Sequence, residues 1–308
     1  MSTTPDSMMY AVMPVPFAPA QIVSTTATNA QAAWAAGTYA LGATVTHTAP
    51  ASSPVSLHVW ESLTAGNTTV PGADPIKWLD LGPANTQAMF DRFVSTQTTA
   101  ASPLVVVLQP GTYTSNIALL NLVGTSATVE MLVSGTPVYT ATIDLQGAEI
   151  ASWWDYYFAP DEQITRLVLN DLPMHIGHQL RITLTGTGNV AIGQCIYGTR
   201  QDLGALQYGA TASVIDYSRK TTDDFGVTTF VERDYADEFG GQLLVENNQL
   251  NRIKRILRKL RATPTVYVGS DDDRFRELFV AYGWVRSHRV AVQYPNNALL
   301  DIEIGALT

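Results

Sequence analysis

The stretch Asn248–Asp273, NQLNRIKRILRKLRATPTVYVGSDDD, carries the clearest secondary-structure signal in the chain. Its apolar residues recur at spacings of three and four, which places them on one face of a helix. These residues are Leu250, Ile253, Ile256, Leu257 and Leu260. Because basic residues occupy most of the other positions, we predict an amphipathic helix over Asn251–Arg261 that buries its apolar face and exposes a basic one.

The residues after this helix predict a C-terminal α+β domain, residues 216–308. Ser270 followed by three aspartates is typical of a helix start, where unpaired N–H groups favour negative charge. A second helix is expected over Arg274–Tyr282, ending at Gly283 as a C-terminal cap. Three strands complete this helix–strand–helix–strand unit: Thr265–Val268, Val285–Tyr294 and Leu299–Ile304.

The basic charge of the chain is concentrated on the first helix. The formal net charge is −9 and would be −15 without the six Lys and Arg residues of this helix. An acidic chain with one basic helix argues against nucleic-acid binding, in which a basic face dominates. We expect the helix to meet an acidic protein surface through Arg252, Arg255, Arg258 and Lys259. A solvated outer face is the simpler alternative.

Cysteine content and hydropathy exclude several classes. The chain has one cysteine, Cys195, so an intrachain disulfide framework and a cysteine-based zinc site are excluded. The N-terminus lacks the basic region and continuous apolar core of a signal peptide, and no segment reaches the length of a membrane span. We therefore expect a protein made in a cytoplasm, without membrane insertion.

The first 29 residues predict an extended arm. Prolines at positions 5, 14, 16 and 19 disfavour a continuous helix, and Asp6 is the only Asp, Glu, Lys or Arg before Glu61. Disordered tails usually carry more charge than this. We expect the arm to lie along a partner, with simple fraying of the terminus as the alternative.

Residues 30–95 are expected to form a small β module rich in aromatic residues and glycine. Alternating runs at Thr44–His47 and Leu57–Ser62 predict short strands, and glycines and prolines between them predict turns. Four aromatic residues dominate the module: Trp34, Tyr39, Trp60 and Trp78. In so small a domain they are expected either to form the core or to offer a platform on which a sugar ring stacks.

The order of these residues resembles the small chitin-binding type 3 modules. It runs Trp34-x-x-Gly37-x-Tyr39-x-x-Gly42, then an aromatic strand, a Pro-Gly turn and the closing Trp78. Versions of the module in tailed-bacteriophage tail and fibre proteins often end in Trp-Leu-Asp-Leu-Gly-Pro … Met-Phe-Asp, and this chain has that run at positions 78–83 and 89–91. The resemblance covers about a fifth of the chain and implies a phage tail protein with a carbohydrate-binding-like module.

Residues 96–215 predict a β-sandwich. Apolar runs such as Leu104–Leu108 and Val129–Val133 alternate with turn residues at short intervals. The segments 166–173, 179–184 and 190–193 are similar to galactose-binding-like jelly rolls. Such a resemblance implies a fold, not a function.

The aromatic run Ser152–Phe158, SWWDYYF, stands out within this domain. As a strand, it would place Trp153 and Tyr157 on one face and Trp154 and Tyr156 on the other. One row would be core, and the other would be covered by protein or by a sugar. Trp153 and Tyr157 therefore join the four module aromatics as candidate carbohydrate-binding residues.

The segment Asp216–Leu244 is expected to connect the sandwich to the C-terminal unit, with a polar loop at Ser218–Gly226 and a strand at Val227–Arg233. From this loop to the final Ile-Glu-Ile-Gly-Ala-Leu-Thr, the sequence also resembles C-terminal segments of tailed-phage virion proteins.

Catalytic and metal-binding motifs are lacking. The five histidines form no His-Glu-x-x-His motif, and the glycine between His175 and His178 disfavours a helical ligand pair. Nucleophile-elbow, P-loop and dinucleotide fingerprints are also missing. We expect no catalytic residue, metal, cofactor or enzymatic activity. A polysaccharide hydrolase is the alternative if two carboxylates come together in space.

These observations predict a structural protein of a tailed-phage virion, at the tail tip, baseplate or fibre attachment. Its partners would be other virion proteins and copies of itself, and it would act by subunit assembly. The alternative is a carbohydrate-binding adhesin of the tail that recognises a host surface glycan.

Overall fold

The computed structural model describes residues 8–146, 152–158, 163–233, 235–270 and 278–307. The chain divides into two compact units. The N-terminal unit comprises residues 15–198, and the barrel unit comprises residues 8–14 and 199–307. Strands dominate both units, so the predicted mainly-β class is confirmed.

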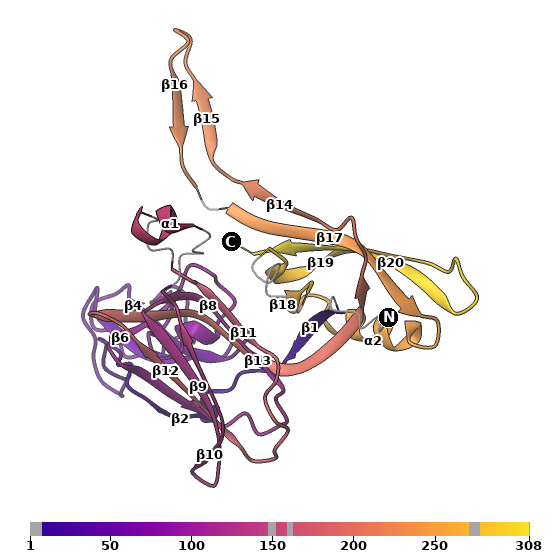
Figure 1. Cartoon of the computed structure of the whole chain (residues 1–308). Coiled ribbons are helices and arrows are strands. Elements are labelled where there is room, and N and C mark those ends of the chain that lie inside the picture. Colours follow the sequence, from indigo (N-terminus) through magenta and orange to yellow (C-terminus); the bar gives the residue numbers. More distant parts are fainter. Residues whose placement is uncertain (1–7, 147–151, 159–162, 234, 271–277, 308) are drawn as a thin grey trace. The chain divides into compact units, whose positions relative to one another are not determined.

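Six strands of the barrel unit form a closed barrel (Figure 1). In order around the barrel they are the end of β13 (Asn189–Leu206), β1 (Met8–Pro14), β18 (Thr265–Val268), β19 (Val280–Ala291), β20 (Asn297–Ala306) and β17 (Tyr235–Glu246). β17 pairs back to β13 at Ala205↔Leu244 and Leu206↔Leu243. Closure leaves these strands without an unpaired edge within the barrel.

Apolar side chains that alternate along the strands, together with the apolar face of the amphipathic helix, fill the barrel core. Ala298, Leu300, Ile302 and Ile304 are buried along β20, whereas Glu303 between them is exposed. The helix predicted from the opening stretch is present as α2 (Leu250–Lys259). Its apolar residues join the same buried cluster as side chains of β1, β17, β18 and β20: Ile253, Ile256, Leu257 and Leu260. The amphipathic pattern therefore serves to dock the helix on the barrel.

The second predicted helix is wrong at its C-terminal end. β19 begins at Val280 and runs through Gly283, which pairs with Thr265 of β18 and Ala306 of β20. Gly283 is thus a mid-strand residue and not a helix cap. The N-terminal part of that prediction, including Asp271–Asp273, lies outside the described residues.

A long hairpin extends from the barrel where a linker was predicted. β14 (Thr211–Asp216) pairs with the first half of β17. Beyond it, β15 (Arg219–Thr222) and β16 (Thr228–Val231) pair only with each other among the described strands (Figure 1). We call residues 217–233 the distal hairpin. Every residue from 219 to 233 is exposed.

Two larger sheets and one small sheet make up the N-terminal unit. The first has the order β10 (Thr136–Asp144), β9 (Ser126–Val133), β12 (Gln179–Thr185), β7 (Leu104–Leu108) and β2 (Ile22–Thr25). The second contains β11 (Arg166–Leu169), β8 (Asn116–Val123), the start of β13 and β6 (Thr98–Ala101). Side chains of both sheets, such as Val129, Ile182, Leu119 and Ile192, share one buried cluster.

The small sheet corresponds to the aromatic module. It has the order β3 (Thr44–Ala49), β4 (Ser56–Ser62) and β5 (Trp78–Pro83). The two predicted strands therefore pair with each other, and the closing Trp78-Leu-Asp-Leu-Gly-Pro83 run forms the third strand.

The extended N-terminal segment is built into sheets of this chain. β1 pairs with β18, and its residues 9–12 are buried. β2 pairs with β7 at the edge of the five-stranded sheet. Burial within the chain's own fold therefore accounts for the uncharged composition of residues 9–12, whereas residues 18–20, 23 and 24 are exposed. The division between units also differs from the expected boundary at residue 215, because it falls between Gly198 and Thr199, within β13.

Within the described residues, no helix combines the length and the apolar character needed to cross a membrane.

Candidate functional site

The aromatic residues of the small module form its core. Trp60 and Trp78 are 8% and 2% exposed and belong to one cluster with Val45 and Ala49. The indole Nε1 of Trp60 donates to the carbonyl of His47 at 3.1 Å, and that of Trp78 donates to the carbonyl of Thr69 at 2.9 Å. With their polar atoms paired inside the fold, these rings hold the three strands together. This arrangement corresponds to the core alternative.

Trp34 and Tyr39 border that core. Both are half-buried and pack against the Trp60–Trp78 cluster. The Tyr39 ring meets Trp78 edge-on with 5.5 Å between centroids, and its hydroxyl donates to the carbonyl of Ala35 at 2.7 Å. None of the four module aromatics therefore presents a flat, freely exposed face.

A groove opens beside the module, on the side of β4 and β5. Its volume is about 670 Å³, within the range of ligand pockets. Its lining mixes apolar residues with polar and charged ones: Ala49 to Pro54, Ser56, His58, Trp60, Gly72, Asp80, Gly82, Pro83, Asp91, Arg92 and Phe93. Phe93 is 63% exposed and Arg92 is also exposed, so an aromatic ring and a guanidinium face solvent here.

A hydrogen-bonded row crosses the wall of this groove. Ser56 and His58 lie two apart on β4, so their side chains share one face, and Asp80 lies on the neighbouring β5. The Nε2 atom of His58 lies 3.1 Å from the Ser56 hydroxyl, and Nδ1 lies 2.8 Å from Oδ1 of Asp80. Ser56 is only 1% exposed, so its hydroxyl is not presented to a substrate. We interpret the row as a polar brace between β4 and β5.

Asp91 is a second carboxyl group in the lining of the groove. Its carboxylate accepts hydrogen bonds from the Phe93 amide at 2.8 Å, from the Thr96 hydroxyl at 2.6 Å and from Nε2 of Gln194 at 3.1 Å. Burial raises the pKa of Asp91, and these hydrogen bonds together with the nearby His58 offset part of that effect. The groove therefore holds one carboxyl group that prefers the protonated form more than an exposed aspartate does.

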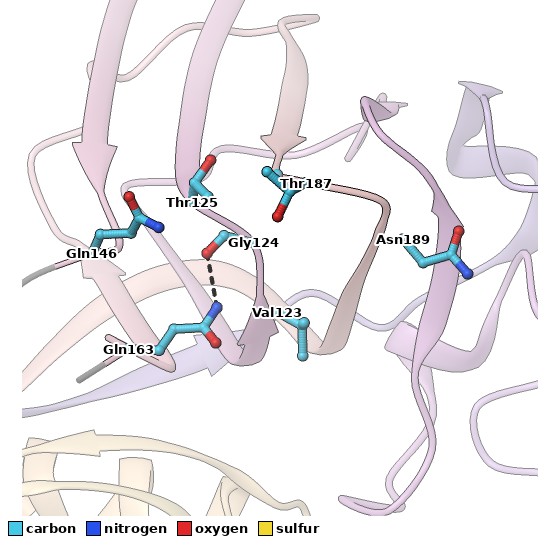
Figure 2. A pocket seen from close by; sticks show the side chains of 8 residues that line it. Val123, Gly124, Thr125, Gln146, Gln163, Thr187 and Asn189 are labelled. Atoms are coloured by element: carbon cyan, nitrogen blue, oxygen red, sulfur yellow. Dashed lines mark hydrogen bonds between the residues drawn. The ribbon is translucent and has the colours of Figure 1, made fainter. Parts of the chain in front are cut away.

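A second, smaller pocket lies at one end of the larger sheets (Figure 2). The described residues that line it are uncharged and lie in or beside the connections between strands: Val123, Gly124, Thr125, Gln146, Gln163, Gly186, Thr187 and Asn189. The Gln163 amide donates to the carbonyl of Gly124 at 2.8 Å, as Figure 2 shows. At about 230 Å³ the pocket is smaller than typical ligand pockets, and it therefore carries less weight than the groove.

The aromatic run at 152–158 is a helix and not a strand. Trp153–Phe158 forms α1, so the two predicted rows of side chains do not exist. Trp153, Trp154 and Tyr157 are 80%, 70% and 69% exposed. In a helix, Tyr157 lies beside both Trp153 and Trp154, because it follows them by four and three residues. Trp153 and Tyr157 thus form an exposed aromatic surface, separate from the groove.

The basic residues of α2 face outward. Arg252, Arg255, Arg258 and Lys259 are all exposed. Within the described residues none of them forms an ion pair. Their charge is therefore compensated by solvent or by a partner. Arg258 and Lys259 lie in the last turn, where the helix dipole favours cations.

A pocket of about 160 Å³ lies at the C-terminal end of this helix. We call it the α2 pocket. Its residues are Leu257, Arg258, Leu260, Arg261, Ala262, Trp284, Val285 and His288. Leu257 and Leu260 are buried, whereas Arg258, Arg261 and His288 are exposed. The pocket therefore combines an apolar interior with a basic rim.

His178 and Cys195, which the sequence raised as candidates for metal binding or nucleophilic chemistry, are both buried within the fold. Nε2 of the buried His178 lies 2.6 Å from the Thr114 hydroxyl, and Nδ1 lies 2.8 Å from the carbonyl of His175. Burial lowers the pKa of His178 and raises that of the Cys195 thiol. Among the described residues, no group of three His, Cys, Asp or Glu side chains is placed to hold a metal ion.

Sequence reasoning missed the groove and the α2 pocket, because both combine residues from segments far apart in the chain. The distal hairpin, by contrast, has a recognisable signal in the sequence. Thr-Thr-Asp-Asp-Phe-Gly-Val-Thr-Thr places a glycine-containing turn between two β-branched runs, which is a hairpin signal.

Comparison with protein-family models, with curated proteins and with solved structures finds no match to this chain. Functional inference therefore depends on the surfaces described above.

Proposed function

We propose that this protein is a structural component of a tailed-phage virion, at the tail tip, baseplate or fibre attachment, and that it acts by subunit assembly. The distal hairpin carries this proposal. An isolated two-stranded hairpin is only marginally stable in water. This one nevertheless exposes five large apolar side chains: Tyr217, Phe225, Val227, Phe230 and Val231. Such a surface is best explained by a protein partner that covers it.

The energetics favour an assembly with many equivalent contacts. Burying one Phe or Val side chain contributes roughly 1.5–3 kcal/mol. Association itself costs about 4–15 kcal/mol in lost freedom, so one hairpin contact gives at most modest affinity. Repeated contacts in a closed, symmetric assembly raise the apparent affinity through effective concentration. The exposed basic face of α2 supports the same reading, because charge complementarity sets register between subunits.

The likeness of the aromatic module to modules of phage tail proteins supports the virion assignment. We further interpret the two facing sheets of residues 15–198 as the jelly roll predicted from the sequence. Jelly rolls serve many functions, so this interpretation adds a fold and no activity.

The test removes the distal hairpin. Asp216 and Tyr235 are register partners, so a two-residue Asn-Gly turn can join them in place of residues 217–234. We expect light scattering to show a closed oligomer for the full-length chain and a monomer for the shortened one, with equal thermal stability. A full-length chain that is monomeric alone and with purified virion proteins, or a shortened chain that assembles normally, would refute the proposal.

Carbohydrate binding is the second candidate, and the groove favours it. An exposed aromatic ring at Phe93, the guanidinium of Arg92 and the carboxylate of Asp80 are the mixture of apolar and polar groups that sugars require. Under this second proposal, the protein would be an adhesin of the tail that recognises a host surface glycan.

Chitin oligosaccharides added to the full chain would test this candidate through tryptophan fluorescence, because Trp60 lines the groove. Quenching lost in F93A places the sugar in the groove, and quenching lost only in W153A places it on α1. The absence of any quenching would remove the adhesin candidate.

A further inference from the structure

We infer that the tip of the distal hairpin, Asp224 and Phe225, inserts into the α2 pocket of a second copy of this chain. The inference rests on the proposed assembly function and names the contact that builds the assembly. It joins two features of the barrel unit: an exposed acidic-aromatic tip and a pocket with an apolar interior and a basic rim.

The tip is held in a defined conformation. The Asp223 carboxylate accepts hydrogen bonds from the amides of Phe225 at 3.0 Å and Val227 at 2.8 Å. Gly226 adopts φ +84°, which closes a three-residue hairpin loop. The next two side chains, Asp224 and Phe225, therefore project from a fixed turn, and Phe225 is 92% exposed. A pre-organised tip loses little conformational entropy when it binds.

The size of the pocket suits one aromatic ring. Its volume is about 160 Å³, and an apolar protein cavity of about 150 Å³ is large enough to bind benzene. Leu257, Leu260 and Val285 supply apolar contacts, and Trp284, which is 38% exposed, offers an aromatic partner for the Phe225 ring.

Charge at the two surfaces is complementary. The tip residues 223–226 include two aspartates and no basic residue. The nearby Lys220 lies over the ring of Phe230, 5.8 Å from its centroid, and not at the tip. Among the described residues, the pocket lining includes Arg258, Arg261 and His288 and no acidic residue. The C-terminus of a helix carries only about half a negative charge, so two arginines leave the pocket positive. Asp224 is therefore placed to pair with Arg258 or Arg261 once Phe225 is seated.

The occupant must come from another molecule. Both features belong to the barrel unit, and among the described strands β15 and β16 pair only with each other. Phe225 is 92% exposed and does not line the α2 pocket, so the pocket does not hold the tip of its own chain. Contact between two different surfaces of identical chains is heterologous, and repetition closes into a ring when the rotation allows it.

Charge exchange tests the contact. The full-length variants D224R and R258E/R261E place like charges together, so we expect each to raise the dissociation constant of the assembly at least about tenfold. The triple variant D224R/R258E/R261E restores opposite charges, and its dissociation constant should return to within about threefold of the wild-type value. K254E reverses one positive charge on α2 outside the pocket, and it should leave assembly within about threefold of wild type.

The outcomes separate this inference from the proposed function. Wild-type protein that never assembles would refute both. Wild-type protein that assembles while D224R and R258E/R261E assemble equally well would overturn the α2 pocket contact and leave assembly through another surface. Loss of assembly in both variants without recovery in the triple variant would also overturn the direct pairing, provided that all variants melt within about 2 °C of wild type.

Discussion

Gly283 on β19 lies so close to Gly305 on β20 that a Cβ atom at position 283 would lie 2.0 Å from the carbonyl oxygen of Gly305. The same Cβ would lie 2.7 Å from Cα of Ala306. Both neighbours are backbone atoms, which cannot move aside as a flexible side chain can. The missing side chain at Gly283 is thus a condition for β19 and β20 to pair inside the barrel.

Replacing Gly283 with alanine should therefore destabilise the barrel unit by roughly 3 kcal/mol or more, because two paired strands must separate locally. G305A is the matched control. Its new Cβ would meet nothing closer than 3.6 Å, so we expect a change within about 1 kcal/mol. Urea unfolding of both variants measures the difference, and equal stabilities would contradict the close approach.

A substitution at Ala262, the third residue after α2, should instead stabilise the barrel unit. It adopts φ +59°, a left-handed conformation that is unfavourable for a residue with a side chain by about 1–2 kcal/mol. A262G removes the steric cost of this conformation. Glycine, however, loses more conformational entropy than alanine on folding, which costs roughly 0.5–1 kcal/mol. We expect a net gain of about 0.5 kcal/mol in the free energy of unfolding. A loss of stability in A262G would show that the alanine methyl group matters more than the backbone conformation.

The raised pKa of Asp91 predicts a dependence of stability on pH. Burial raises the pKa of Asp91 in the folded chain, so its carboxyl group holds its proton to a higher pH there than in the unfolded chain. The contribution of this pKa shift to the free energy of unfolding is therefore fully present below the unfolded-state pKa, and it is lost as the pH rises through the folded-state pKa. D91N cannot titrate but keeps an oxygen for the Phe93 and Gln194 donors.

We expect D91N to gain stability relative to wild type as the pH rises from about 3 to about 7. Urea unfolding at several pH values measures this difference. Parallel stability profiles for the two proteins would mean that burial does not shift the pKa of Asp91.

The basic face of α2 predicts salt-sensitive assembly. Replacing Arg255, Arg258 and Lys259 with alanine removes exposed charge without touching the buried Ile253, Ile256 and Leu257. We expect normal folding but weaker assembly, with most of the difference from wild type disappearing at about 1 M salt, where exposed charges are screened beyond about 3 Å. Circular dichroism checks folding and light scattering at low and high salt checks assembly. Unchanged assembly at low salt would remove α2 as an interface.

Local patterns were sufficient where burial follows periodicity. The spacing of Ile253, Ile256 and Leu257 predicts α2, and the alternation of Leu300, Ile302 and Ile304 predicts β20, because each pattern marks the face that leaves water. The aromatic module was also predictable, since Trp60 and Trp78 have few other places to be buried in a small domain.

Predictions failed where short-range signals compete with distant contacts. Gly283 has the chemistry of a helix cap, but its neighbours are Gly305 and Ala306, which no local window contains. Trp153–Phe158 is rich in residues that favour strands, yet it forms a helix. The candidate surfaces also combine residues from separate segments, because the α2 pocket joins Leu257 to Trp284 and the groove joins His58 to Asp80 and Asp91.

The mainly-β class, the amphipathic character of α2 and the concentration of basic charge on it can all be derived from the sequence. These properties follow from composition and spacing within a few residues. By contrast, the position of β1 between β13 and β18, the closure of six strands into a barrel and the projecting hairpin after β14 become evident only in the folded chain. Strand order and closure depend on pairing between residues far apart in the chain, such as Ala11 with Tyr267, and no local pattern records such partners.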